Sequence, residues 1–67
     1  MKAIGNDLVG TWRRFGEIGP VYEIIRAGKV SPDGRRFMRI KVLESDEEVD
    51  YPLADILEDP LEYPREL

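Results

Sequence analysis

A strict alternation of side chains between residues 35 and 44 is the feature that most limits what this chain can fold into. In the segment RRFMRIKVLE, Met38, Ile40 and Val42 alternate with a phenylalanine, an arginine and a lysine. A period of two is the period of a β-strand, in which successive side chains point to opposite faces of a sheet. The segment therefore predicts a strand with one apolar face, and a sheet to which that strand belongs.

Turn-forming residues divide most of the chain into short segments of the same kind. SPDG at 31–34 combines a proline that fixes φ, an aspartate that bonds to the backbone and a closing glycine, and SDEE at 45–48 is a second turn. GEIGP at 16–20 has the composition of a loop. The intervening segments are rich in strand-forming residues, and we expect the first to be bent or bulged at Gly10. We expect strands at 8–15, 21–30, 35–44 and 49–53.

The residues after the last predicted strand change to the period of a helix. Leu53, Ile56 and Leu57 recur at i, i+3 and i+4 within PLADILEDP at 52–60. Pro52 suits the first helical position, and Pro60 ends the segment. We expect one or two helical turns whose apolar stripe covers an open end of the sheet.

Together these segments predict a mostly β fold, a small four-stranded antiparallel meander with one short C-terminal helical turn. Tyr22 and Ile24 are expected to face its core. Such a sheet can protect its edges by curling into an SH3-like barrel, or it can stay open and be capped by the helix. We expect residues 1–67 to form a single small domain with flexible segments at 1–7 and 61–67.

The charge of the chain is divided between its two halves. Residues 1–41 contain nine basic and four acidic residues, a net charge of +5, whereas residues 42–67 contain one basic and ten acidic residues, a net charge of −9. A hairpin centred on Ser45 and Asp46 places a basic third strand beside an acidic fourth strand. Its cross-strand pairs are Val42 with Val49, Ile40 with Tyr51, and Lys41 with Asp50. A register shifted by two residues keeps the same faces, so both registers remain open.

The sequence lacks the side chains that most often carry catalysis and metal binding. It has neither histidine nor cysteine, which removes the commonest general base, the commonest transition-metal ligand and any disulfide. The loop GEIGP leads into a predicted strand instead of a helix, so it does not fit a phosphate-binding loop. The acidic segment ESDEEVD at 44–50 lacks the glycine of an EF-hand loop. We expect no catalytic activity, no cofactor and no metal.

The distribution of apolar residues argues against a membrane protein. No apolar run approaches the roughly 20 residues of a membrane span. The segment MKAIGNDLVGTW lacks the apolar region of a signal peptide. We therefore expect a cytoplasmic protein that makes no membrane contact.

Three blocks between Phe15 and Pro60, about two thirds of the chain, carry a likeness to a known family. They are FGEIGPVYEI, DGRRFMRIKVLES and EEVDYPLADILEDP. These blocks resemble a family of short uncharacterised bacterial proteins, a domain of unknown function with FGxxGPxYEI, RIKV and EExDYPLxDIxxDP-like segments. The resemblance implies a bacterial, single-domain protein, and it implies neither an activity nor a site residue.

The charge pattern favours a non-enzymatic module that binds another macromolecule, with a protein as the leading partner. The candidate binding residues are Arg13, Arg14, Arg35 and Arg39 on the basic side, and Glu47, Glu48, Asp55 and Glu58 on the acidic side.

Two other partners stay open. A small nucleic-acid-binding β-barrel would stack bases on aromatic rings and bind phosphates with guanidinium groups, although an acidic net charge disfavours it. Its residues would be Trp12, Arg13, Arg14, Arg36 and Phe37. A homodimer that pairs sheet edges is the third possibility.

Overall fold

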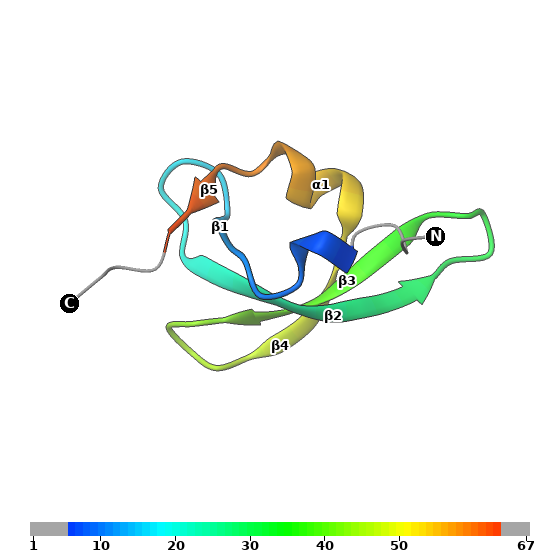
Figure 1. Cartoon of the computed structure of the whole chain (residues 1–67), viewed down its shortest axis with the longest axis horizontal. Helices are drawn as coiled ribbons and strands as arrows, with labels where there is room; N and C mark the ends of the chain where they lie inside the picture. The colour runs from blue at the N-terminus through cyan, green and yellow to red at the C-terminus, as the bar shows by residue number, and fades with distance from the viewer. Residues whose placement is uncertain (1–5, 64–67) are drawn as a thin grey trace.

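The strands of the protein form one antiparallel sheet, which a computed structural model describes within residues 6–63 (Figure 1). The strands are β1 (Trp12–Arg14), β2 (Val21–Val30), β3 (Arg36–Val42), β4 (Glu48–Pro52) and β5 (Leu61–Glu62). A 3-10 helix, η1 (Asn6–Leu8), precedes β1, and the helix α1 (Leu53–Glu58) follows β4. The spatial order is β4-β3-β2-β1-β5, so four strands form a meander and β5 returns to pair with β1.

The predicted mostly β fold is confirmed, with two differences in its outline. The sheet is not closed, because β4 and β5 form its two edges, so the open sheet and not the barrel is the form adopted. The sheet is extended to five strands by Leu61 and Glu62, which pair with Arg13 and Trp12. These two residues lie in a segment that we expected to be flexible. We expected flexible segments at 1–7 and 61–67. Within these segments, residues 1–5 and 64–67 lie outside the described part of the chain.

The first strand is shorter than the predicted 8–15. Residues 6–8 form η1, and Thr11 closes the turn after it by donating to the carbonyl of Leu8 from its backbone nitrogen at 3.0 Å and from Oγ1 at 2.6 Å. Gly10, between η1 and Thr11, has a φ of +90°, which takes the backbone out of strand geometry. The regular ladder therefore begins at Trp12, although Gly10 donates to the carbonyl of Ile24 at 2.8 Å and Ile24 donates to the carbonyl of Thr11 at 3.0 Å.

The hydrophobic core lies on the face of the sheet that α1 and η1 cover, since Ile56 of α1 belongs to it and Leu8 of η1 packs against it. Figure 1 shows both elements on the same side of β2 and β3. The fully buried side chains of the core are Tyr22, Ile24, Met38, Ile40 and Ile56. The alternation read in β2 and β3 therefore reports the buried face correctly. The predicted helical stripe is wrong at Leu57, which is 58% exposed, because a six-residue helix presents only Ile56 fully to the sheet.

The β3–β4 hairpin adopts the register that is shifted by two residues from the one centred on Ser45 and Asp46. Ile40 pairs with Val49 in place of Tyr51. The connection is longer than a two-residue turn, since the backbone of Val42 bonds to Glu47 at 2.8 Å and Asp46 has a φ of +62°. The charge complementarity survives the shift. Its cross-strand pairs are Arg39 with Asp50 and Lys41 with Glu48.

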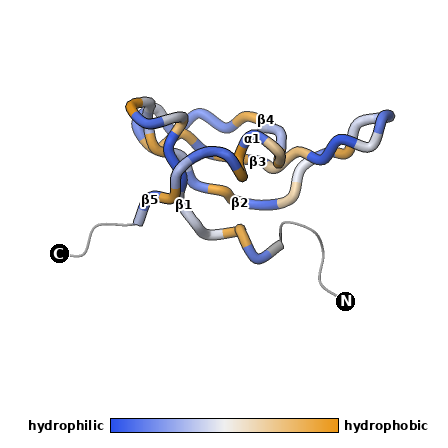
Figure 2. Tube along the Cα trace, turned by 90° about the horizontal axis from the view of Figure 1, so that it is seen from above, coloured by the Kyte–Doolittle hydropathy of each residue, from blue (hydrophilic) through white to orange (hydrophobic). Residues whose placement is uncertain are grey.

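The tip of the β2–β3 hairpin projects beyond the rest of the sheet (Figures 1 and 2). β1 pairs with β2 only between Val21 and Glu23, and β4 pairs with β3 only as far as Phe37. Residues 29–36 therefore form a two-stranded extension, which we call the hairpin arm; the remaining described residues are the body. Gly34, with a φ of +88°, closes the predicted SPDG turn, and its nitrogen donates to the carbonyl of Ser31 at 2.9 Å.

Candidate functional site

The carboxylate of Asp59, just after α1, connects the helix to the sheet. Its Oδ2 accepts hydrogen bonds from the Tyr22 hydroxyl at 2.7 Å and the Tyr51 hydroxyl at 3.2 Å. Its Oδ1 accepts from the backbone nitrogen of Gly16 at 3.1 Å. The aromatic rings of Phe15, Tyr22 and Tyr51 pack against one another beside it, with centroids 4.4 to 5.6 Å apart. The carboxylate is thus occupied by three internal donors.

Both tyrosines of this cluster are held in the protonated form. Burial raises the pKa of Tyr22 far above its usual value of 10, and the hydrogen bond to Asp59 adds to the effect. Burial and the negative charge of Asp59 raise the pKa of Tyr51 to about 12. A phenol that donates to a carboxylate and resists ionisation makes a poor general base at neutral pH. The hydrogen bonds of the cluster thus connect the end of α1 to β2 and β4.

Arg13 also performs an internal role. It is opposite the buried Tyr22 in the β1–β2 ladder, so its side chain lies on the covered face of the sheet. Its Nη1 donates to the carbonyls of Ile56 at 3.2 Å and Asp59 at 2.9 Å. These carbonyls lie at the end of α1, where a helix has unpaired acceptors and where positive charge is favourable. Arg13 thus fastens the helix to β1.

The other basic side chains of the body pair with acidic neighbours, with Arg26 at the foot of the arm as the exception. Arg14 contacts Glu62 at 3.1 Å, and it also donates to the carbonyl of Gly19. Arg39 lies 3.4 Å from both Glu48 and Asp50 across the β3–β4 hairpin, and Lys41 lies 4.0 Å from Asp46. The bipolar charge of the sequence is therefore used largely within the fold.

The hairpin arm differs, because its cations are exposed and form no ion pair with any described residue. Arg26 at its foot and Lys29, Arg35 and Arg36 within it are exposed, and none has an ion-pair partner within residues 6–63. The ring of Phe37 gathers two of them, with Lys29 Nζ 5.0 Å and the Arg35 guanidinium 5.6 Å from its centroid.

The one acidic residue of the arm, Asp33, is bonded within the turn. Its carboxylate accepts from the hydroxyl of Ser31 and from the backbone nitrogen of Arg35, and these bonds lower its pKa. Asp33 therefore shapes the turn, while the cationic side chains of the arm remain exposed.

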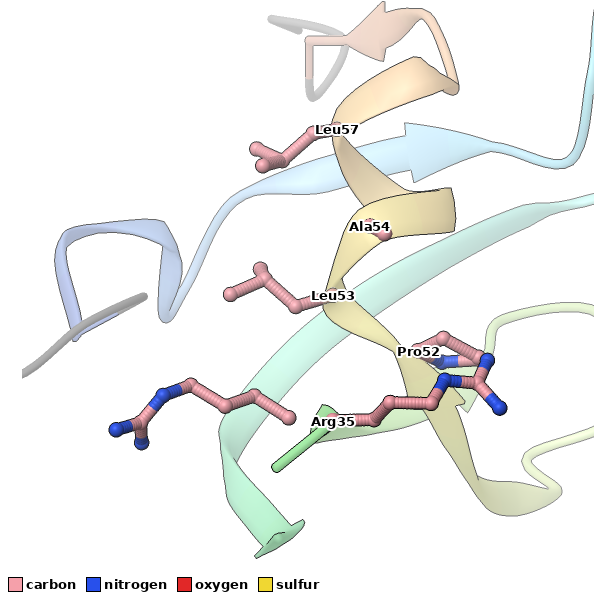
Figure 3. A pocket seen from close by; sticks show the side chains of 6 residues that line it. Arg35, Pro52, Leu53, Ala54 and Leu57 are labelled. Atoms are coloured by element: carbon pink, nitrogen blue, oxygen red, sulfur yellow. The ribbon is translucent and has the colours of Figure 1, made fainter. Parts of the chain in front are cut away.

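A shallow pocket of about 280 Å³ opens between the hairpin arm and α1 (Figure 3). It is lined by Arg35, Arg36, Pro52, Leu53, Ala54 and Leu57. Figure 3 shows Leu53 and Leu57 pointing to the same side of the helix, with Arg35 beside Pro52 at one end. Leu57, the helical residue predicted to face the sheet, thus forms an exposed apolar wall beside two arginines that have no ion pair within the described range.

The predicted site residues do not gather on one surface. Of the four basic candidates, Arg13, Arg14 and Arg39 are bonded within the body, and only Arg35 lies on the hairpin arm. The acidic candidates lie at opposite ends of β4. Glu47 and Glu48 lie at its start, with Glu48 bound to Arg39, whereas Asp55 and Glu58 are exposed on α1.

The predicted nucleic-acid surface is also dispersed. Trp12 is half-buried on β1 and Phe37 is half-buried on β3, with β2 between them. Arg13 faces the covered side, and Arg14 is paired with Glu62. Of these five residues, only Arg36 and Phe37 lie at the hairpin arm.

Sequence reasoning did not select Arg26, Lys29 or the apolar lining of the pocket. A signal for the two cations was present, since basic residues flank the SPDG turn on both sides. These residues were assigned to strands, and a strand pattern alone does not show which part of a hairpin extends past its neighbours. The pocket depends on where α1 lies against the arm, which no local pattern specifies.

The described residues add two further facts about possible sites. Between residues 6 and 63, no cluster of three acidic side chains is close enough to bind a metal ion. In the same range, no helix has the length and apolar character that crossing a membrane requires.

Comparison with known proteins places the chain in a family without giving it an activity. A search of curated proteins finds no match. The model of DUF5397, described as a family of unknown function, matches residues 1–63. Because that match covers nearly the whole chain, the protein belongs to this family of unknown function.

Proposed function

We propose that the protein is a non-enzymatic module that binds a short acidic segment of a partner protein through its hairpin arm. The observation that carries this proposal is the contrast in pairing of the basic side chains. Arg14, Arg39 and Lys41 have acidic partners within the fold, whereas the basic residues of the arm have none among residues 6–63. Exposed guanidinium groups bind carboxylates in pairs of parallel hydrogen bonds.

The charge around the arm favours a short acidic segment over a nucleic acid. The arm holds three basic residues and one acidic residue, a net charge of +2. The rest of residues 6–63 holds five basic and twelve acidic residues, a net charge of −7. Because screening limits such interactions to roughly 8 Å at physiological salt, a short segment need only meet the arm. A longer nucleic acid would extend over the acidic body and be repelled there.

A pair of matched double variants tests the proposal. The probe is a fluorescein-labelled peptide with one alanine between two runs of three glutamates, and binding is followed by fluorescence anisotropy at low salt. Arg35→Gln with Arg36→Gln removes two charges from the arm, and Arg39→Gln with Lys41→Gln removes two charges from the part of β3 that lies in the body. We expect the arm variant to bind roughly tenfold more weakly, the effect of two exposed ion pairs, and the body variant to change affinity less than twofold.

Three results would overturn this proposal. No binding of the peptide by the wild-type protein at low salt excludes recognition of acidic segments. A single-stranded oligothymidine that binds more tightly than the peptide, with a steep salt dependence, establishes the nucleic-acid alternative. Self-association in sedimentation that is lost in the arm variant makes a second copy of this chain the partner. We also propose that the protein is cytoplasmic, as expected from the sequence.

A further inference from the structure

The pocket between the hairpin arm and α1 combines an apolar wall with cationic sides. Pro52, Leu53, Ala54 and Leu57 supply carbon surface, and Leu57 leaves 58% of its area exposed. Arg35 and Arg36 are exposed and line the same pocket. An exposed leucine alone is ordinary on a protein surface. A leucine that lines a concave site together with two unpaired arginines is a feature of binding sites.

We propose that this pocket takes one aliphatic side chain of the acidic segment, so that the protein recognises a leucine-like residue with carboxylates next to it. This inference rests on the proposed function, since it names the second contact of the same partner. The apolar lining excludes a charged side chain from the floor of the pocket. The two arginines then bind the carboxylates of the residues that flank the anchor.

The pocket is large enough to admit one aliphatic side chain. Its volume of about 280 Å³ is just below the roughly 300–1,000 Å³ of sites that enclose a cofactor or a drug-sized ligand. An apolar side chain seated in a pocket is one form of anchor at the centre of a protein–protein contact. The pocket is also open at its surface, which a peptide backbone passing over it requires.

The acidic residues of α1 fix the side on which the carboxylates lie. Asp55 and Glu58 are exposed on the same short helix that lines the pocket. Like charges repel, so the carboxylates of a bound segment are placed on the side of the hairpin arm, beside Arg35 and Arg36. The pocket thus has a polarity that a purely apolar groove would lack.

Two peptides and three variants test this inference. The first peptide has one leucine between two runs of three glutamates, and the second has alanine in place of that leucine. Partial burial of the three additional carbon atoms predicts roughly tenfold tighter binding of the leucine peptide. Ala54→Leu fills the pocket, and Leu57→Gln makes its wall polar. Both positions are exposed, and we expect both variants to fold. Ile18→Gln, at a side chain that is 96% exposed on the β1–β2 loop, is the matched control.

The expected result is that both pocket variants bind the two peptides equally, while the Ile18→Gln variant keeps the preference for leucine. Unfolding by urea confirms that each variant is folded. Equal binding of both peptides by the wild-type protein, with loss of both in the arm variant, would overturn the pocket inference and leave the proposed function in place. A preference for leucine that survives Ala54→Leu would also overturn it, because the anchor would then lie elsewhere. Failure of both peptides to bind would overturn the proposed function itself.

Discussion

The body and the hairpin arm are built from the same β2 and β3 strands, yet they use charge in opposite ways. In the body, Arg39 lies between Glu48 and Asp50, and Arg13 is bonded to the end of α1. In the arm, Lys29 and Arg35 gather over the ring of Phe37, and neither has an ion pair within the described range. A cation that has an internal partner contributes to the fold, whereas the cations of the arm, which have no such partner among residues 6–63, are the ones that the proposed function assigns to another molecule.

From this difference we expect substitutions in the body to lower the free energy of unfolding, and substitutions in the arm to lower only the affinity for a partner. A domain of this size has a free energy of unfolding of roughly 3–10 kcal/mol. The loss of a few kcal/mol in the body therefore removes a large part of the stability. The arm contributes no residue to the buried core, so its side chains are expected to tolerate exchange. Matched substitutions in the two regions test this expectation.

The largest expected effect comes from replacing one aspartate in each region. Asp59→Ala removes the acceptor of the Tyr22 hydroxyl, which belongs to a fully buried side chain, and of the Gly16 nitrogen. A buried donor left without a partner costs the desolvation of that group, so we expect a loss of about 2–4 kcal/mol in the free energy of unfolding. Asp33→Ala in the arm should leave the midpoint of urea unfolding close to that of the wild-type protein.

Asp59→Asn serves as a second variant should the alanine protein fail to fold. An asparagine keeps one acceptor oxygen and loses the charge, so its unfolding midpoint should lie between those of Asp59→Ala and the wild-type protein. If Asp33→Ala lowers the unfolding midpoint as much as Asp59→Ala does, the expected difference in stability between body and arm is wrong. That outcome would mean that the SPDG turn helps to stabilise the core.

Local patterns in the sequence predicted the parts of the fold that depend on neighbours along the chain. The β2 strand at 21–30 has the expected bounds because a glycine-proline loop and the SPDG turn lie at its two ends. Tyr22, Ile24, Met38 and Ile40 are buried as the alternation requires. The two-residue β5 strand could not be predicted, since two residues carry no period. Its pairing with β1 depends on contacts across about 50 residues of chain.

The candidate site was less predictable for the same reason. The sequence indicated that arginines are numerous, but whether a given arginine is paired depends on the register of the β3–β4 hairpin and on the position of α1. Arg13 shows this most clearly, because the carbonyls to which it donates lie 43 and 46 residues along the chain. Only Arg35 of the four basic candidates combines exposure with the absence of an ion pair in the described part.

The next effect in size is a loss of stability at alkaline pH that belongs to the body. The pKa of Tyr51 is raised from 10 to about 12, chiefly by burial, and that of Tyr22 is raised further. Between pH 10 and 12 the folded state therefore holds protons that the unfolded state has lost, so the free energy of unfolding falls as the pH rises. The contribution is complete below pH 10 and is lost as the pH passes through about 12.

Urea unfolding at a series of pH values from 8 to 12 measures this dependence. Tyr51→Phe is the control, because it removes one of the two phenols and leaves every other titrating group in place. Its unfolding midpoint should fall less steeply above pH 10 than that of the wild-type protein. Identical slopes for the two proteins would show that ionisation of Tyr51 is not linked to unfolding.

The smallest expected change in the free energy of unfolding comes from replacing one arginine in each region by methionine. Two opposing contributions meet at Arg13. Its two bonds to the carbonyls of Ile56 and Asp59 are charge-assisted and favour folding, while its Nε–H is buried without a partner and opposes folding. Since two bonds outweigh one unsatisfied donor, we expect Arg13→Met to lower the free energy of unfolding by about 1 kcal/mol. Arg36→Met in the arm should change it by less than about 0.5 kcal/mol. A more stable Arg13→Met protein would show that the buried Nε–H costs more than the two bonds return, and that Arg13 positions α1 without stabilising it.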